Sequence, residues 1–162
     1  IGVAAYPHKH PESSSLLQDI EILLSKQRAG ADFAITQVFF ETERYSGLVD
    51  AARLAGVQVP IIPGIMPVTS LTRLTKLCEL AGLEVPRELA HRLETASDSR
   101  ELHRIGVEHA LNQCRKLLDA GAPGLHFYTF NEHEAVLDVL EELDVPRYSN
   151  RFKLPLSDLQ YL

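Results

Sequence analysis

The sequence predicts an α/β protein of the (β/α)8 TIM-barrel type in which four of the eight strand–helix units are present. Short, continuously apolar runs alternate with amphipathic stretches, which is typical of parallel strands buried on both faces. Polar residues gather directly after each run, as they do at the carboxyl ends of barrel strands. A complete barrel needs about 250 residues, so 162 residues fit half of one. A small flavodoxin-like sheet also fits the length, but polar residues after every strand favour the barrel.

Each element follows from a local pattern. Four strands are expected over residues 1–6, 33–40, 59–66 and 125–130. Apolar residues spaced at the helical period predict helices over about 14–29, 42–55, 70–81, 86–95 and 99–119. A last helix is expected to begin at Asn131, with Glu134 completing a pattern close to a capping box. Ser70 is expected to be an N-cap and Pro86 to occupy the first helical position.

Four helices are expected to end alike, on an alanine followed by a glycine that takes the left-handed conformation. These glycines are Gly30, Gly56, Gly82 and Gly121. The first three are evenly spaced, and the extra helix over 86–95 explains the longer last interval. A repeated strand–helix–glycine unit of this length predicts a parallel sheet.

Composition excludes several classes of function. The net charge of −6 and the pI near 5.6 argue against binding to nucleic acid or to a membrane surface. The apolar runs are far shorter than the roughly 20 residues that a membrane span needs. Cys78 and Cys114 form no CxxC motif and lie on apolar helix faces, so both are expected in the core of a cytoplasmic protein. The chain opens without methionine inside an apolar run, and we expect it to be part of a longer polypeptide.

Motif searches leave few candidate sites. His8 and His10 could be two metal ligands, but no acidic or cysteine cluster completes a set, so no metal is expected. One of the two histidines is expected to be functional and the other solvated. The chain has no GxGxxG, P-loop or GxSxG motif. Gln37 interrupts a largely apolar strand. It is either a core amide whose hydrogen bonds are made within the protein or an amide that faces a polar heterocycle in a ligand site. Pro63 and Gly64 are residues that strand interiors disfavour. They are expected to form either a bulge at the barrel rim or a bend in the backbone that lets a ligand approach closely.

Four segments, taken in order, carry a family resemblance. They are residues 4–7 with 10–12, 29–40, 61–67 and 125–131. Across about residues 1–145 they resemble the methylenetetrahydrofolate reductase family, flavoproteins built on a (β/α)8 barrel. In that family these segments are the last four strands. The resemblance therefore implies that the chain is the C-terminal half of the barrel, residues 1–146, followed by a tail, residues 147–162.

The resemblance also implies an activity and its residues. It implies FAD as cofactor, NADH or NADPH as electron donor, and reduction of methylenetetrahydrofolate to methyltetrahydrofolate, the methyl donor for methionine synthesis. Cofactor-binding positions fall on Tyr6, His10, Ser13, Asp19, Ile22, Ser25 and Lys26. Their spacing alone places Asp19 and Lys26 on one side of a helix. That side is either a polar stripe exposed to solvent or a face that lies under an extended ligand. Gln37 falls on the glutamine that faces folate and nicotinamide.

The chain departs from the family at three substrate positions. Arg73 stands where a glutamine is common, Leu77 where some bacterial members have a phenylalanine, and Glu132 where an arginine often meets the folate. An anion at 132 weakens attraction to the glutamate tail, and Arg73 is the residue that would compensate. In the family, the catalytic glutamate and the aspartate near the flavin belong to strands outside the matched segments, so the resemblance assigns no catalytic residue to this chain.

The expected partners are a folate and the missing N-terminal half of the barrel, in the same or another chain. The open edges of a half barrel also allow a homo-oligomer. Two alternatives stay open. One is a non-catalytic half barrel that binds flavin or dimerises. The other is a different barrel enzyme, either another flavin-dependent oxidoreductase or a lyase.

Overall fold

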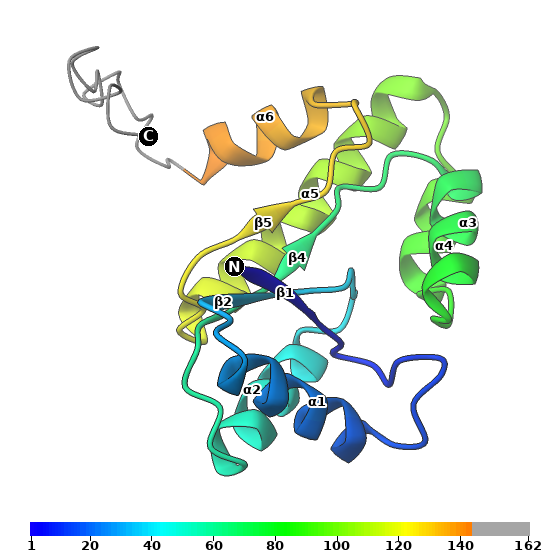
Figure 1. Cartoon of the computed structure of the whole chain (residues 1–162). Helices are drawn as coiled ribbons and strands as arrows, with labels where there is room; N and C mark the ends of the chain where they lie inside the picture. The colour runs from blue at the N-terminus through cyan, green and yellow to red at the C-terminus, as the bar shows by residue number, and fades with distance from the viewer. Residues whose placement is uncertain (144–162) are drawn as a thin grey trace, which may run out of the picture.

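The computed structural model describes residues 1–143, in which short parallel strands alternate with helices (Figure 1). The predicted tail, residues 147–162, and the end of the predicted barrel domain, residues 144–146, lie outside the described residues. The strands are β1 (Gly2–Ala5), β2 (Phe33–Thr36), β3 (Ile61–Ile62), β4 (Gly64–Ile65) and β5 (His126–Phe127). The helices are α1 (Leu16–Arg28), α2 (Thr42–Leu54), α3 (Leu71–Ala81), α4 (Arg87–Glu94), α5 (Ser99–Asp119) and α6 (Glu134–Glu142).

All the strands pair in parallel. One sheet has the order β1-β2-β3, and a second pairs β4 with β5. The register places Ala5 opposite Thr36, Ala34 opposite Ile61 and Gly64 opposite His126. Parallel neighbours require crossover connections, and the helices supply them. The predicted α/β class with parallel sheets is confirmed.

The prediction of one strand over residues 59–66 is wrong, because the structure has two short strands separated by Pro63. Proline has no N–H to donate to a strand ladder. The carbonyl of Pro63 accepts a hydrogen bond from the backbone N–H of His126 at 3.0 Å. The chain thus passes at Pro63 from pairing with β2 to pairing with β5. The strands predicted over 33–40 and 125–130 are also shorter in the structure, at 33–36 and 126–127.

Gly64 is required because two neighbouring groups approach its backbone. A Cβ atom here would lie 2.4 Å from the carbonyl oxygen of Thr36 and 2.6 Å from the ring of Tyr128. The Gly64 N–H also donates to the Thr36 hydroxyl at 2.9 Å. The groups that closely approach Gly64 are therefore Thr36 and Tyr128 of the protein itself. The contact with Thr36 joins the end of β2 to the second sheet.

The helix ends follow the sequence closely, with two exceptions. The four predicted glycines have positive φ angles, and Ser70 accepts a hydrogen bond from the N–H of Arg73 at 3.2 Å. Pro86 is the N-cap of α4, one position before the one predicted. The helix predicted from Asn131 begins instead at Glu134, without a side-chain cap. Its expected capping box does not form because Asn131 itself takes a left-handed φ of 65° in the preceding turn.

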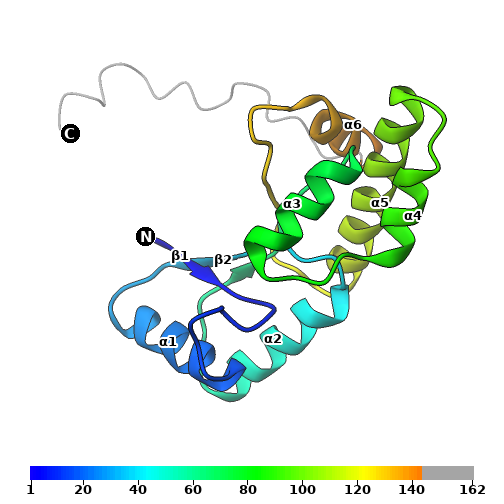
Figure 2. The ribbon, with the colours of Figure 1, turned by 90° about the vertical axis from the view of Figure 1, so that its right-hand side faces the viewer.

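Two hydrophobic clusters hold the elements together. In the first, residues of α1, α2 and α5 pack against β1, β2 and β3, with Leu23, Leu48 and Leu117 fully buried. The second joins α3, α4 and α5 to the residues that follow β2 and β4. Figure 2 shows α1 and α2 on one side of the strands and α3 to α6 gathered on another. Cys78 and Cys114 are 1% and 0% exposed, which confirms their predicted place in the core.

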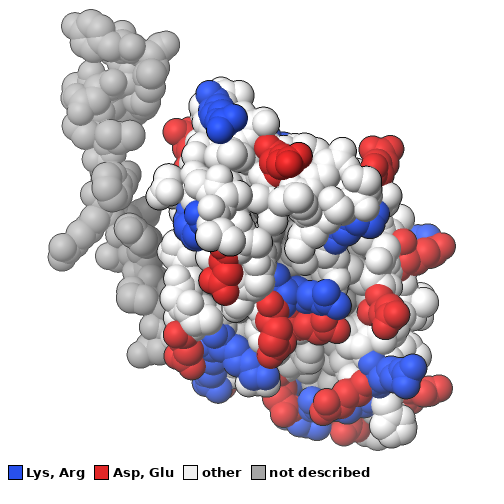
Figure 3. Space-filling view, turned by 90° about the horizontal axis from the view of Figure 1, so that it is seen from below, with Lys and Arg blue, Asp and Glu red and all other residues white. Residues whose placement is uncertain are grey.

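No helix within residues 1–143 is both long enough and apolar enough to cross a membrane. On the face that carries α1 and α2, acidic and basic side chains are interspersed (Figure 3).

Candidate functional site

Polar residues follow β1, β2, β4 and β5 where these strands end, and they line three cavities. The α1 cavity lies between the end of β1 and helix α1, with a volume of about 350 Å³. The Gln37 cavity, about 140 Å³, lies between the β1–α1 loop and the end of α3. The Arg73 cavity, about 320 Å³, lies between α3 and the segment joining β5 to α6. Carboxyl ends of parallel strands are the usual ligand sites of α/β proteins.

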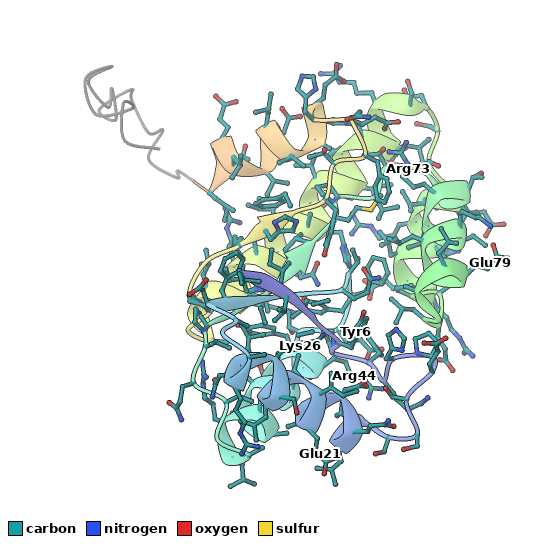
Figure 4. All side chains as sticks on the ribbon, viewed as in Figure 1. Tyr6, Glu21, Lys26, Arg44, Arg73 and Glu79 are labelled. Carbon is teal, nitrogen blue, oxygen red and sulfur yellow. The ribbon has the colours of Figure 1, made fainter. Side chains whose placement is uncertain are left out.

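The α1 cavity collects the residues predicted to bind a cofactor. Its lining includes all of them except Ser25, namely Tyr6, His10, Ser13, Asp19, Ile22 and Lys26. Ser25 is exposed, does not line the cavity, and donates its hydroxyl to the carbonyl of Glu21 at 2.9 Å. Figure 4 shows Tyr6 and Lys26 near each other beside α1, whereas Arg73 lies apart on α3.

Asp19 fixes the loop that forms one wall of the α1 cavity. Asp19 is 8% exposed, and its carboxylate accepts hydrogen bonds from the backbone N–H of His10 at 2.9 Å and from the Ser13 hydroxyl at 2.5 Å. A buried carboxylate needs such partners to offset its desolvation. The role that the geometry gives Asp19 is to hold His10 and Ser13 in position.

Tyr6 and His10 form an aromatic corner beside this carboxylate. Their ring centroids are 4.6 Å apart at 75°, an edge-to-face arrangement that aromatic pairs favour. The Nδ1 atom of His10 accepts a hydrogen bond from the N–H of Glu12 at 3.2 Å. Lys26 donates from Nζ to the carbonyl of Ala4 at 2.9 Å, so its charge is held against the end of β1.

Gln37 lies in the Gln37 cavity, next to the α1 cavity, and the two cavities share Tyr6 and His10. The Gln37 backbone N–H donates to Ala5, and its side-chain oxygen accepts from the N–H of Val38, both at 2.9 Å. The described residues offer its Nε2 group no hydrogen-bond acceptor. This half-buried amide is therefore oriented by its oxygen, and its Nε2 group has no partner among residues 1–143.

His8, one of the polar residues that follow β1, also lines the Gln37 cavity. The His8 side chain is half-buried, and this burial is the main reason that its pKa lies below the usual range. The positive charge of the nearby Arg44 lowers the pKa further. The sequence predicts one functional and one solvated histidine in this loop, and in the structure both His8 and His10 line the Gln37 cavity. Within residues 1–143 no group of three potential ligand side chains could hold a metal ion.

Arg73 and Glu132 meet across the Arg73 cavity. The two guanidinium Nη atoms donate to the two carboxylate oxygens, which makes a bidentate ion pair between α3 and the β5–α6 segment. The hydrogen bond from Arg73 holds the pKa of Glu132 below its usual range, and the same bond raises the pKa of Arg73. The two departures noted in the sequence are thus partners. Leu77 is almost fully buried in the second hydrophobic cluster and does not line this cavity.

Tyr128 links the Arg73 cavity to the end of β2. Its ring lines this cavity, and its hydroxyl donates to the carbonyl of Thr36, the residue before Gln37, at 3.0 Å. Burial raises the pKa of this phenol. The polar residues after β1, β2 and β5 therefore lie along one continuous rim.

This rim and the parallel sheets define an α/β protein with candidate ligand cavities at the carboxyl ends of its strands. The chain belongs to the methylenetetrahydrofolate reductase family, because the family's model matches residues 1–144. It is 39% identical over 145 residues to a Caenorhabditis elegans protein named probable methylenetetrahydrofolate reductase (NADPH), a match covering 88% of this chain and 22% of that protein. It is 36% identical over 146 residues to the Escherichia coli 5,10-methylenetetrahydrofolate reductase, covering 90% and 49%. The chain thus spans less than half the length of either relative.

A solved structure shares the fold. It is an uncharacterized protein from Clostridium thermocellum that binds two copies of 5-methyl-5,6,7,8-tetrahydrofolic acid. The TM-score is 0.58 at 18% identity, and the match covers 88% of this chain and 52% of that one. At this identity the likeness concerns the fold alone.

Proposed function

We propose that this chain is part of an FAD-dependent oxidoreductase that reduces methylenetetrahydrofolate to methyltetrahydrofolate with NADH or NADPH as electron donor. Family membership supports the folate reaction. The observation that carries the proposal is the α1 cavity. It brings Tyr6, His10, Ile22 and Lys26 together from a loop and a helix, and it adjoins the free amide donor of Gln37.

The chemistry of the α1 cavity suits FAD. Lys26 offers a cation for a pyrophosphate, the corner of Tyr6 and His10 offers aromatic edges, and Ile22, 40% exposed, offers an apolar surface for a ring. The cavity is smaller than the whole cofactor needs, so this chain would hold only part of it. When bound, FAD supplies the hydride chemistry, and the protein binds and orients it.

Gln37 and the residues around it would orient the substrates. Its Nε2 group can donate a hydrogen bond to a carbonyl or ring nitrogen of a pterin or nicotinamide. The side-chain oxygen is already held by the N–H of Val38, so the amide cannot turn without losing that bond. A fixed donor of this kind selects one orientation of a flat heterocycle.

The chain would form the last four strand–helix units of a (β/α)8 barrel, about residues 1–146. Parallel pairing of successive strands in the order β1-β2-β3 and then β4-β5, with polar residues at the carboxyl ends, supports this arrangement. So does the match to 49% of the Escherichia coli relative. The remaining half, in the same or another polypeptide, would pair with the edge strands β1 and β5 and supply the catalytic acid. We expect residues 1–162 alone to be inactive.

The setting we propose is the cytoplasm. Cys78 and Cys114 are both buried and unpaired, as is usual where thiols stay reduced.

The visible spectrum of the protein purified from its native source tests the cofactor. Flavin bands near one FAD per chain are expected, whereas a colourless protein that never takes up FAD would contradict the proposal. Reduction by NADH or NADPH and reoxidation by methylenetetrahydrofolate then test the substrates. An intact mass well above that of 162 residues would support the half barrel, and a mass of these residues alone would favour a stand-alone module.

A matched pair of lysine variants tests the α1 cavity. Lys26 and Lys116 both lie in the last turn of a helix, but only Lys26 lines the cavity. Lys26→Met is expected to weaken FAD binding by about tenfold or more, the value of one charge-assisted hydrogen bond, while Lys116→Met leaves it unchanged. Equal affinities in the two variants would place the cofactor elsewhere.

A further inference from the structure

The Arg73 cavity carries a charge arrangement that its ligand must accommodate. Its lining includes one positive side chain, Arg73, and two negative ones, Glu132 and Glu134. Thr69 and Asn131 add neutral hydrogen-bonding groups. Its carboxylates therefore outnumber its one guanidinium group, although that arginine is placed to receive a carboxylate.

Glu132 already occupies that arginine. Two parallel N–H···O bonds join the guanidinium to the carboxylate, the same geometry by which an arginine binds a carboxylate ligand. The two partners differ in exposure, because the side chain of Arg73 is 31% exposed and that of Glu132 60%. Arg73 thus belongs to the cavity wall, whereas Glu132 reaches it from the solvent side.

The segment that carries Glu132 is shaped to hold it there. Phe130 and Asn131 both take left-handed φ angles, 47° and 65°, which non-glycine residues rarely adopt in succession. The N–H of Glu132 then donates to the carbonyl of Thr129 at 2.8 Å and closes the turn. Phe130 is 68% exposed, so burial of its ring does not explain the conformation. What the turn achieves is the placement of Glu132 on Arg73.

We propose that Glu132 is a built-in occupant of an anion site, taking the place on Arg73 that a ligand carboxylate would otherwise take. This inference rests on the proposed function for the identity of the natural ligand, a folate whose glutamate tail carries several carboxylates. The paired Arg73 gives such a tail no free cation, and Glu132 and Glu134 repel it. The enzyme therefore gains little from a long anionic tail and accepts folates with short ones.

The first experiment uses glutarate, a five-carbon dicarboxylate, as the probe, titrated into the full 162-residue chain at low ionic strength. Glu132→Gln frees Arg73 and is expected to bind glutarate at least about tenfold more tightly than the unsubstituted chain. Glu134→Gln is the matched control, since it removes one negative charge from the same cavity but leaves Arg73 paired. Combining Arg73→Gln with Glu132→Gln should abolish the gain.

Tighter glutarate binding by Glu132→Gln, but not by Glu134→Gln, that disappears when Arg73 is also replaced supports the occupied anion site. Equal affinities in Glu132→Gln and Glu134→Gln, or a gain that survives loss of Arg73, would overturn it. Glu132→Ala repeats the test with a different side chain, and circular dichroism verifies that each variant is folded.

A second experiment separates this proposal from the proposed function. The protein from its native source and its Glu132→Gln variant are compared for binding of 5-methyltetrahydrofolate with one and with five glutamyl residues. The five-residue form is expected to gain about tenfold over the one-residue form only in the variant. If no folate binds either protein but the glutarate pattern holds, the proposed function fails and the occupied anion site stands. If both folates bind and Glu132→Gln does not change their ratio, the claim about tail length is overturned.

Discussion

Two glycines in helix interiors are expected to respond in opposite ways to the same substitution. Gly47 lies in α2, and a Cβ atom there would meet nothing within 4 Å. Gly106 lies in α5, where a Cβ atom would come within 2.5 Å of the carbonyl oxygen of Val68 and 2.9 Å of the Thr69 side chain. Helix α5 therefore packs against the backbone that leads into the Arg73 cavity.

The magnitudes follow from two known effects. Replacing glycine by alanine inside a helix stabilises by about 1 kcal/mol through propensity alone. Forcing a methyl group into a closely packed contact costs about 1–3 kcal/mol. Because the propensity term is common to both sites, the difference between the free energies of unfolding of Gly47→Ala and Gly106→Ala equals the steric cost, about 1–3 kcal/mol. Gly47→Ala is expected to be more stable than the unsubstituted chain. Gly106→Ala is expected to be at most as stable as the unsubstituted chain, because the steric cost equals or exceeds the gain from helix propensity.

Urea denaturation followed by circular dichroism measures both variants against the unsubstituted chain. Equal m-values would show that the change lies in stability rather than in the unfolded state. If Gly106→Ala stabilised the chain as much as Gly47→Ala, the close packing of α5 on residues 68 and 69 would be refuted. Gly106→Ala should also weaken glutarate binding in the Glu132→Gln background, because Thr69 lines the Arg73 cavity.

Three further predictions concern single groups. Tyr45 donates its buried hydroxyl to the carbonyl of Ile61 at 2.7 Å, so Tyr45→Phe should lower the free energy of unfolding by about 1–3 kcal/mol in urea; no change would mean that the bond is not formed. Arg73→Gln should raise the pKa of Glu132 towards its ordinary value in an NMR titration, since Arg73 holds it low. The stability from this pair is present above the ordinary carboxyl pKa, near 4.3, and is lost as the pH falls through the lower folded value. Burial raises the pKa of Cys114 to about 12, so iodoacetamide at pH 8 should label it only in the unfolded chain; labelling at equal rates in folded and unfolded protein would contradict its burial.

Features fixed by local sequence could be predicted. The left-handed glycines after the helices and the Ser70 cap depend on a few neighbouring residues, and the structure has them as expected. Apolar runs predicted where strands lie but not their lengths, because pairing and not hydropathy sets where a strand ends. Pro63 marked a break in the sequence, but only the pairing of its two sides with different strands shows that it separates two sheets.

Contacts between distant residues could not be predicted. Arg73 and Glu132 are 59 residues apart, and the sequence suggests that Arg73 compensates for the anion at 132 but not that the two side chains pair directly. Their pairing depends on the turn at Phe130 and Asn131, whose left-handed angles no propensity favours for phenylalanine. The capping box predicted at Asn131 failed for the same reason.

The candidate cofactor residues show an intermediate case. The family resemblance predicts that Asp19 belongs to the site. It does not predict that Asp19 anchors His10 and Ser13, because the loop that carries these two residues has no periodic pattern. Ser25 comes from the same helix, yet its side chain bonds back to the helix backbone and does not line the cavity. His8 is half-buried in the structure, which the sequence of its loop does not predict because that loop has no periodic pattern.

Reoxidation of the reduced flavin tests the central claim most directly. The protein purified from its native source is reduced anaerobically with NADH or NADPH and then mixed with methylenetetrahydrofolate, while the flavin absorbance is followed. We predict that the flavin bands return and that one methyltetrahydrofolate forms per flavin reoxidised. A flavin that is reduced but stays reduced after methylenetetrahydrofolate is added would contradict the proposal that this chain contributes to a folate-reducing site.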